Sequence, residues 1–259
     1  MPPRLRIGLF PYLNVQPLIH GLRGDEHAEL VIDVPSRTAD AFRRGELDLA
    51  MVPSLEAATL EAPALDGVAI AAEGAVETVL LHHRVPLAEV RTLAADESSR
   101  TSVALSKILV TQASGRAPIT RPFRASAGET ATDDAILVIG DPAFAFSQPG
   151  YAPLDLAGAW KQAHDLPFVF AVMVVSPRAL RSGLASWIRD AITRGLGAAS
   201  TIAASYNSGV DAARAEHYMR KVIRYDLGPR EKEGLALFHR LAQEHGLLPR
   251  TKELEFHGI

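Results

Sequence analysis

Short apolar runs alternate with polar turns along the first half of the chain. Each run is followed by a turn rich in proline, glycine, serine or asparagine, and in most cases a stretch with helical spacing comes next. Strands that alternate with helices predict an α/β protein with largely parallel sheets. The predicted strands are Ile7–Phe10, Leu30–Val34, Leu47–Val52, Val90–Ala95 and Ala135–Ile139.

The last third of the chain changes character after the apolar run Phe168–Val175, which predicts a strand buried on both faces. Apolar residues in Leu184–Ala199 recur every three or four positions, the spacing of one buried helical face. Two further helices are predicted, over residues 211–224 and 230–245. The end of the chain is therefore expected to be almost wholly helical.

The order of these elements predicts two α/β lobes. The first lobe comprises residues 1–84 plus 176–259, because the C-terminal helices are expected to return to it, and the second comprises residues 85–175. The segments Val79–His83 and Phe170–Val175 are predicted to be the two strands that cross between the lobes. Ligands of open α/β sheets bind beyond the carboxyl ends of the strands, so a cleft between the lobes is expected to hold the site.

Composition narrows the class of protein. The 259 residues are 47% hydrophobic, and 27 Lys plus Arg stand against 30 Asp plus Glu, a net charge of −3. A slightly acidic chain without a long basic run predicts no nucleic-acid partner. No apolar run approaches the roughly 20 residues of a membrane span, and no signal core precedes Leu5, so we expect a cytoplasmic location.

Cysteine is absent from the sequence. Disulfides, cysteine-ligated metals and a thiolate nucleophile are therefore excluded. The pair His82-His83 follows an apolar strand, and one of the two is expected to face the cleft because alternate strand residues point to opposite sides. The sequence contains no zinc-protease, nucleophile-elbow, Walker or dinucleotide-binding motif, so it does not support a hydrolase, an NTPase or a dinucleotide-binding protein, and we expect no metal site.

Small polar residues gather where strands give way to helices. Such residues cap helices for purely structural reasons, but several helix N-termini that converge also form an anion site. The richest cluster is the run Ser98–Ser102, with four hydroxyls and one guanidinium, which suits a carboxylate or a phosphate. From the residues alone we expect an anion-binding cleft of unspecified chemistry. The candidates are Asn14, Ser36, Ser54, Ser99, Arg100, Thr101, Ser102 and Asp141, with Phe168 either at the cleft wall or in the core.

Several motifs also resemble one known family, in order and over nearly the whole chain. The elements Tyr12-Leu13-Asn14 and Ser99-Arg100-Thr101-Ser102 are the most specific, and the runs Asp48–Glu56, Ile139–Ala143 and Leu166–Ala171 agree with them. They resemble the chorismate dehydratase family of the futalosine pathway of menaquinone biosynthesis. The resemblance implies an α/β, two-lobed periplasmic-binding-protein-like (type II) fold with a cleft between the lobes.

The resemblance also implies an activity, the dehydration of chorismate to 3-[(1-carboxyvinyl)oxy]benzoate and water without cofactor or metal. By this resemblance Asn14 matches the active-site asparagine, and Ser54 and the Ser99–Ser102 stretch match substrate-binding loops. Members often carry serine where this chain has His82 and His83, so these two join Asn14 as catalytic candidates. The proton acceptor is left open between an imidazole and the enolpyruvyl carboxylate of the substrate.

Three other functions remain open on the sequence. The same fold serves transport proteins that only bind an organic anion, and it resembles the sister enzyme 1,4-dihydroxy-6-naphthoate synthase. It also serves as the effector domain of transcription regulators, although no helix-turn-helix precedes Leu5 here. No pattern in the sequence indicates an oligomeric state.

Overall fold

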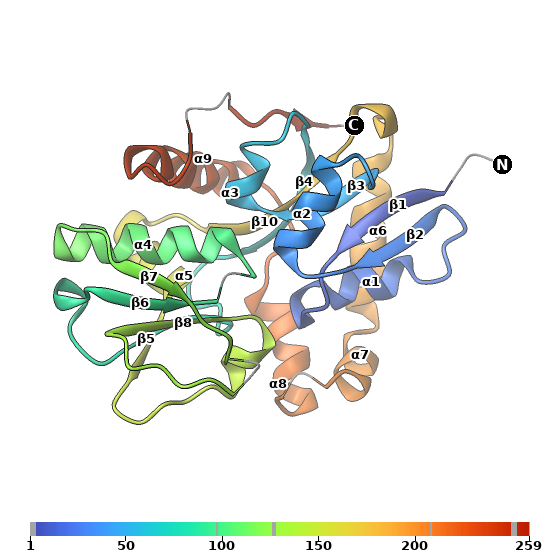
Figure 1. Ribbon diagram of the computed structural model, residues 1–259. Coiled ribbons are helices and arrows are strands. Elements are labelled where there is room, and N and C mark those ends of the chain that lie inside the picture. Colours follow the sequence, from blue (N-terminus) through green and yellow to red (C-terminus); the bar gives the residue numbers. More distant parts are fainter. Residues whose placement is uncertain (1–3, 97, 126–127, 208, 250–252, 259) are drawn as a thin grey trace.

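The computed structural model describes residues 4–96, 98–125, 128–207, 209–249 and 253–258. Figure 1 shows two sheets side by side, each flanked by helices. We call the six-stranded sheet with α1–α3 and α6–α9 lobe 1, and the five-stranded sheet with α4 and α5 lobe 2.

Lobe 1 is built on a mixed sheet whose strand order is β11-β4-β10-β3-β1-β2. β1 runs parallel to β2 and β3, whereas β10 runs antiparallel to both β3 and β4. Every residue of β3 and β10 is buried, which explains why both read as unbroken apolar runs. The strands are β1 (Leu5–Leu9), β2 (Ala28–Ile32), β3 (Leu49–Pro53), β4 (Ala64–Ala72), β10 (Phe168–Val175) and β11 (Phe256–His257).

Lobe 2 has the strand order β7-β6-β8-β5-β9. β6 runs parallel to β7 and β8, and β5 runs antiparallel to β8 and β9. The amino end of β5 therefore lies beside the carboxyl end of β8, with Val79 opposite Ile139. The strands are β5 (Val79–His83), β6 (Thr92–Ala95), β7 (Ile119–Pro122), β8 (Ala135–Ile139) and β9 (Ala152–Asp155).

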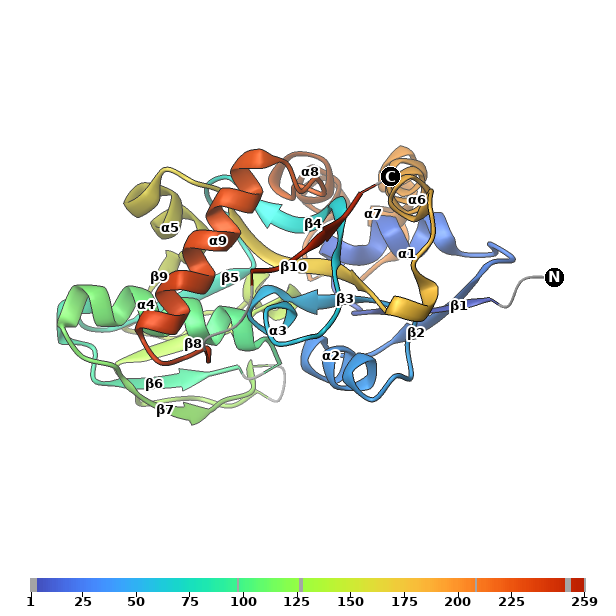
Figure 2. The same cartoon turned by 90° about the horizontal axis from the view of Figure 1, so that it is seen from above.

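Helices cover both sheets, and Figure 2 shows that α9 lies beside β10 and α4. In the described ranges no helix is long and apolar enough to cross a membrane. The helices are α1 (Gln16–Leu22), α2 (Pro35–Arg43), α3 (Ser54–Ala57), α4 (Arg100–Ser114), α5 (Leu156–His164), α6 (Leu184–Gly197), α7 (Ala199–Ser205), α8 (Ala212–His217) and α9 (Pro229–Glu244). Shorter turns are η1 (Leu13–Val15), η2 (Leu87–Glu89), η4 (Asp141–Phe144), η5 (Pro177–Ala179) and the π-helical η6 (Tyr218–Val222).

The predicted strands all occur. The two strands next to the crossings, however, each belong to the lobe other than the predicted one. β5 was expected in the first lobe and pairs in lobe 2, whereas β10 was expected in the second lobe and lies at the centre of lobe 1. Both run antiparallel to their neighbours, so the sheets are mixed rather than largely parallel. The chain therefore crosses between the lobes at residues 73–78 and 165–167.

Three further differences concern lobe 1. The helix expected over Leu184–Ala199 ends at Gly197, and α7 begins at Ala199. The helix expected to reach Arg224 instead ends as the π turn η6. β4 was not predicted, because Gly67, at a φ of +71°, interrupts its apolar run.

Both crossing segments contain a residue in an uncommon backbone conformation. Within the described ranges, Glu77 and Asp165 are the non-glycine residues with positive φ, at 66° and 54°. Beside them, the Glu73 carboxylate pairs with Lys161 from lobe 2 at 3.1 Å and with Arg224 from lobe 1 at 2.8 Å. Lys161 and Arg230 each contact both Glu73 of the first crossing and Asp165 of the second, so the two crossings are linked through these cations.

The helices α1 and α6 pack with their backbones almost touching. A Cβ on Gly21 would lie 1.8 Å from the Ala191 carbonyl oxygen, and one on Gly195 would lie 1.8 Å from that of Pro17. Because an added methyl group has no room in either place, both glycines are required by the packing. This contact fixes α1, and with it the loop that precedes α1, against the rest of lobe 1.

Gly195→Ala is expected to lower the free energy of unfolding by about 3 kcal/mol, because the helices must move apart. Gly197→Ala is the matched control on the same helix, since nothing lies within 4 Å of a Cβ there. That change should leave stability unchanged or raise it by roughly 0.5 kcal/mol through helix propensity. Chemical denaturation of both variants measures the difference, and equal stabilities would contradict the tight packing.

Candidate functional site

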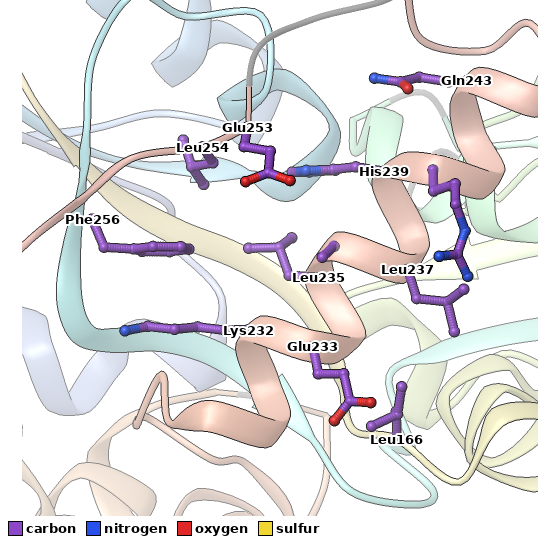
Figure 3. Close-up of a pocket in the computed structure, with 12 residues that line it drawn as sticks. Leu166, Lys232, Glu233, Leu235, Leu237, His239, Gln243, Glu253, Leu254 and Phe256 are labelled. Carbon is purple, nitrogen blue, oxygen red and sulfur yellow. The ribbon is translucent and has the colours of Figure 1, made fainter.

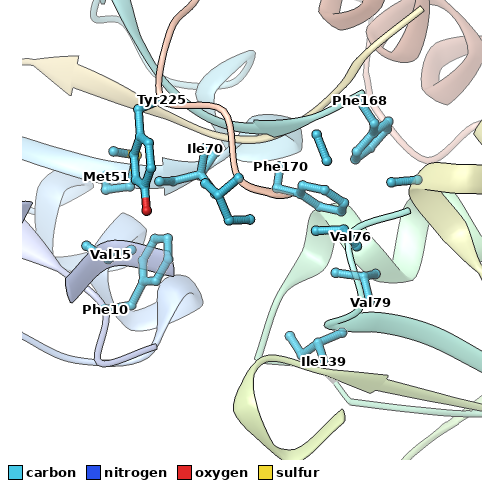
Figure 4. Close-up of a cluster of buried hydrophobic side chains, with 14 of the residues drawn as sticks. Phe10, Val15, Met51, Ile70, Val76, Val79, Ile139, Phe168, Phe170 and Tyr225 are labelled. Atoms are coloured by element: carbon cyan, nitrogen blue, oxygen red, sulfur yellow. The ribbon is translucent and has the colours of Figure 1, made fainter. Parts of the chain in front are cut away.

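A small cavity of about 40 Å³ lies between the two lobes. Its walls are largely apolar, and Figure 4 shows Phe10, Ile70 and Phe170 from lobe 1 facing Val79 and Ile139 from lobe 2. Polar groups enter at a few points. The lining residues are Phe10, Tyr12, Asn14, Pro35, Pro53, Ile70, Val76, Thr78, Val79, Ser99, Ser102, Ile139, Gly140, Phe170 and Ala171.

Asn14 lies in η1, between the end of β1 and the start of α1. Its side chain lines the cavity, and its Oδ1 is buried with no hydrogen-bond partner among the residues that the structure describes. A buried amide oxygen without a hydrogen bond raises the free energy of the folded protein, which indicates that this oxygen accepts a hydrogen bond from a ligand. This is the polar atom that most directly indicates a binding site in the cavity.

The amino end of α4 faces the same cavity with two hydroxyls. Ser99 is the N-cap residue but makes no capping bond with its side chain, and Ser102 donates to its Oγ at 3.3 Å. The first backbone N–H groups of a 15-residue helix have no partner within the helix. Together with the positive end of the helix dipole they favour an anion, as the run of hydroxyls predicted.

Two residues that the sequence reasoning passed over also line the cavity. Thr78 ends the first crossing, and its hydroxyl shares a hydrogen bond of 2.7 Å with the Tyr218 hydroxyl. Tyr12 contacts the Ser98 hydroxyl at 3.3 Å, and burial raises its pKa. Thr78 could have been predicted as a polar residue just before β5. The sequence analysis instead placed the carboxyl end of that strand at the cleft.

His82 and His83 do not line the cavity. Because β5 is antiparallel, its amino end meets the cleft, whereas both histidines lie at its other end beside Ala135 and Ile136. His82 is buried against Phe146 with ring centroids 4.8 Å apart, and burial lowers its pKa. The structure therefore does not bring either imidazole together with Asn14.

Ser36, Ser54 and Thr101 likewise lie next to the cavity without lining it, and each makes a bond within the protein. Ser36 donates its backbone N–H across the cleft to the Ser98 carbonyl at 3.2 Å. Ser54 donates its hydroxyl to the Val169 carbonyl at 2.7 Å. Thr101 accepts the Leu55 N–H at 3.0 Å, also between the lobes. These residues hold the lobes and α3 in place.

Arg100 is engaged by acids of lobe 1. Its guanidinium donates to the buried Glu56 carboxylate and lies 3.5 Å from a carboxylate oxygen of Asp40. It is not among the residues that line the cavity. The structure thus separates Arg100 from the serines on either side of it and gives it a bond between the lobes.

Phe168 belongs to the core rather than to the cleft wall. Its ring packs edge-on against Trp160 and Phe238, at centroid distances of 5.2 and 5.0 Å. Phe170 lies two residues along the same strand face and lines the cavity instead. Asp141 is also absent from the lining, because its carboxylate accepts the Leu13 N–H at 3.0 Å and the Tyr206 hydroxyl at 2.5 Å.

A larger cavity of about 710 Å³ lies along α9, outside the cleft. Figure 3 shows Leu235, Leu254 and Phe256 on one side and the polar His239 and Glu253 nearby. None of the predicted site residues lines it. Over the described ranges, no group of three or more His, Asp or Glu side chains could hold a metal ion.

The sequence matches the family model described as menaquinone biosynthesis over residues 5–244. A chorismate dehydratase from Thermus thermophilus is 30% identical over 262 residues, covering 90% of this chain and 93% of that protein. Among solved structures, protein AF1704 from Archaeoglobus fulgidus superposes with a TM-score of 0.70 at 17% identity, covering 95% and 98% of the two chains. The periplasmic aliphatic sulphonate binding protein SsuA from Escherichia coli gives a TM-score of 0.64 at 14% identity, covering 98% and 91%. These structures confirm the expected two-lobed periplasmic-binding-protein-like fold.

Arg100→Ala is expected to lower the free energy of unfolding by about 1.5–3 kcal/mol, because it leaves the buried Glu56 carboxylate without its cation. Arg37→Ala is the control, since that guanidinium is 75% exposed and lies 3.8 Å from Asp33. Combining Arg100→Ala with Glu56→Gln should recover part of the loss. Unchanged stability together with a raised KM would instead assign Arg100 to the substrate.

Proposed function

This chain belongs to the menaquinone biosynthesis family, and we propose that it is a chorismate dehydratase. It would act as a hydro-lyase that converts chorismate into 3-[(1-carboxyvinyl)oxy]benzoate and water. The observation that carries the proposal is the unpartnered Oδ1 of Asn14, which shares one cavity with the amino end of α4. An amide that can donate and accept, opposite an anion-binding helix end, suits a substrate with two carboxylates and one hydroxyl.

The elimination needs a proton acceptor and help for the leaving hydroxide. The C3–H bond breaks, its electron pair forms the C3=C4 double bond, and the C4 hydroxyl leaves, so that proton and hydroxide together make one water. The aromatic ring that results supplies the driving force. Hydrogen bonds from Asn14, Ser99, Ser102 or Thr78 to the leaving oxygen would stabilise the charge that develops there.

The position of the histidines favours one of the two proton acceptors considered above. Neither His82 nor His83 lines the cavity. The enolpyruvyl carboxylate of chorismate is attached to the reacting carbon through the ether oxygen and one vinyl carbon, so it can reach the C3 proton once it is held in place. We therefore assign proton transfer to the substrate itself, with the protein supplying position.

Apolar walls complete the proposed site. Phe10, Phe170 and Ile139 would contact the ring of the substrate and exclude water from it. In such a low-dielectric setting each hydrogen bond to the substrate is stronger than it would be in water. Chorismate fits this combination of apolar walls and a few polar groups, because it presents carboxylates at its ends and a carbon ring between them.

The cavity as described is too small for such a ligand. Its 40 Å³ falls far below the roughly 300–1,000 Å³ of typical small-molecule pockets. The lobes must therefore separate to admit chorismate, and the side chains that line the cavity must move aside to make room for it when the lobes close again. The cross-lobe bonds at Ser36 and Thr101 are among those that opening would break.

The proposed activity is tested by incubating the purified protein with chorismate. We expect the ultraviolet absorbance of the cyclohexadiene to disappear and mass spectrometry to show a product lighter by one water. Binding of chorismate without turnover would favour an organic-anion binding protein. If the folded protein neither binds chorismate nor converts it, the proposal is wrong.

Asn14→Asp is expected to reduce kcat/KM by about 10²-fold or more, the scale of one lost transition-state donor. The change keeps the shape of the side chain but removes its N–H donors and brings a negative charge to a dianionic substrate. The other asparagine of the chain, the exposed Asn207, provides the matched control Asn207→Asp, which should retain activity. Full activity of Asn14→Asp with normal stability would place the catalytic amide elsewhere.

A further inference from the structure

We propose that Asp141 and Tyr206 are positioning residues that complete the fixing of the Asn14 loop when the two lobes close, an inference that rests on the proposed function. Asp141 is the first residue of η4 in lobe 2. Its Oδ1 accepts the backbone N–H of Leu13, the residue before Asn14, at 3.0 Å. Its Oδ2 accepts the hydroxyl of Tyr206 at 2.5 Å. One carboxyl of lobe 2 therefore binds two donors of lobe 1.

Tyr206 holds the other end of the same loop. It follows α7 directly, and its hydroxyl also contacts the carbonyl oxygen of Pro11. The Gln16 side chain donates to that carbonyl at 3.1 Å. The loop is thus fixed at the Pro11 carbonyl and at the Leu13 N–H, and the catalytic candidate Asn14 is the next residue. The position of the Asn14 side chain in the cavity follows from these two backbone contacts.

Gly140 brings Asp141 close enough to make these bonds. It has a φ of +68°, and a Cβ at this position would lie 2.9 Å from the Tyr12 ring. A residue with a side chain would therefore push the turn away from the loop and is also disfavoured by the backbone conformation. The direct contact between the Gly140 backbone and the Tyr12 ring sets the distance at which the Asp141 carboxyl meets the Leu13 N–H.

The Asp141 carboxyl can bind Tyr206 in its charged or its neutral form. The Tyr206 hydroxyl has one hydrogen, which it can donate to Asp141 Oδ2 or to the Pro11 carbonyl oxygen. When it donates to Pro11, a protonated carboxyl can donate to the Tyr206 oxygen in turn. The titratable groups that face Asp141 are the phenols of Tyr12, Tyr206 and Tyr218. Burial raises the pKa of Asp141, in agreement with the neutral form.

The arrangement couples closure to catalysis. Leu13 and Tyr206 belong to lobe 1 and Asp141 to lobe 2, so opening the cleft removes both bonds to the carboxyl at once. The Leu13 N–H would then have lost its acceptor, and the loop before Asn14 would be held only at the Pro11 carbonyl, by contacts within lobe 1. Since a misplacement of about 1 Å can reduce a rate about 10²-fold, the amide would be competent only around an enclosed substrate.

Four variants test the role of the pair. Asp141→Asn can still accept from Leu13 and donate to Tyr206, as the neutral carboxyl would, whereas Asp141→Ala can do neither. Tyr206→Phe removes the hydroxyl on the other side. The matched control is Tyr151→Phe, because the Tyr151 hydroxyl donates to the Asp133 carbonyl at 2.6 Å within lobe 2, away from the cavity.

Two readouts are measured on each variant: the kinetics of chorismate dehydration, and deuterium exchange of the backbone amides of residues 11–15. We expect Asp141→Ala and Tyr206→Phe to lower kcat about 10-fold or more with KM within about twofold, and to speed exchange at Leu13. Asp141→Asn and Tyr151→Phe should keep kcat within about threefold and leave that exchange unchanged. The combined variant Asp141→Ala with Tyr206→Phe should be no worse than either alone, because the two act as one unit.

Three results would overturn the inference. Equal losses in Asp141→Asn and Asp141→Ala would show that a charged carboxylate is required. Equal losses in Tyr206→Phe and Tyr151→Phe would reduce the effect to general destabilisation. Unchanged exchange at Leu13 in Asp141→Ala would show that the loop is held by other contacts. Because exchange needs no substrate, it decides the positioning role even if the wild-type protein fails to dehydrate chorismate.

Discussion

The double crossing of the chain between the lobes is the constraint on which the rest of the structure depends. The two connecting segments, residues 73–78 and 165–167, lie beside each other, because Lys161 and Arg230 each contact Glu73 in the first and Asp165 in the second. With two neighbouring connections, the lobes can open and close, but they cannot slide freely or rotate independently. The same residues of the two lobes therefore face each other across the cavity each time the lobes close.

This register matters because neither lobe holds a complete site. Lobe 1 supplies Asn14 and Phe170, and lobe 2 supplies the amino end of α4 and Ile139. Apolar walls with few polar groups suit the proposed elimination, in which the substrate carries its own proton acceptor. The protein then has to position the substrate and help hydroxide to leave, which fits a cavity with amide and hydroxyl groups.

Much of the fold could be predicted from the sequence because its signals are local. β8 and β10 have the predicted bounds, since unbroken apolar runs between turns leave little choice. What could not be read was the direction of β5 and the partners of β10, because strand pairing depends on contacts far apart in the chain. The same limit applied to the site. Asn14, Ser99 and Ser102 line one cavity. The sequence placed the carboxyl end of β5 at the cleft, so it predicted His82 and His83 there and did not predict Thr78.

The neighbours of the serines illustrate a second limit. Arg100 carries the charge that suits a dianion and Asp141 is a polar residue at a strand end, but sequence alone could not show that each is already bound by the opposite lobe. A side chain that closes the cleft and one that binds the ligand have the same residue type and nearly the same position in the chain. Only the interatomic distances in the structure distinguish these two roles.

The central claim, that the substrate is enclosed between lobes that open to admit it, is tested most directly by a distance between them. The chain has no cysteine, so Arg37→Cys on α2 and Gln112→Cys on α4 would place two spin labels uniquely at exposed positions. Pulsed electron paramagnetic resonance then gives the distribution of distances without ligand and with the product 3-[(1-carboxyvinyl)oxy]benzoate. We expect a broad distribution that includes longer distances without ligand and a single narrow, short distance with product. One unchanged distribution in both conditions, with product bound, would contradict the claim.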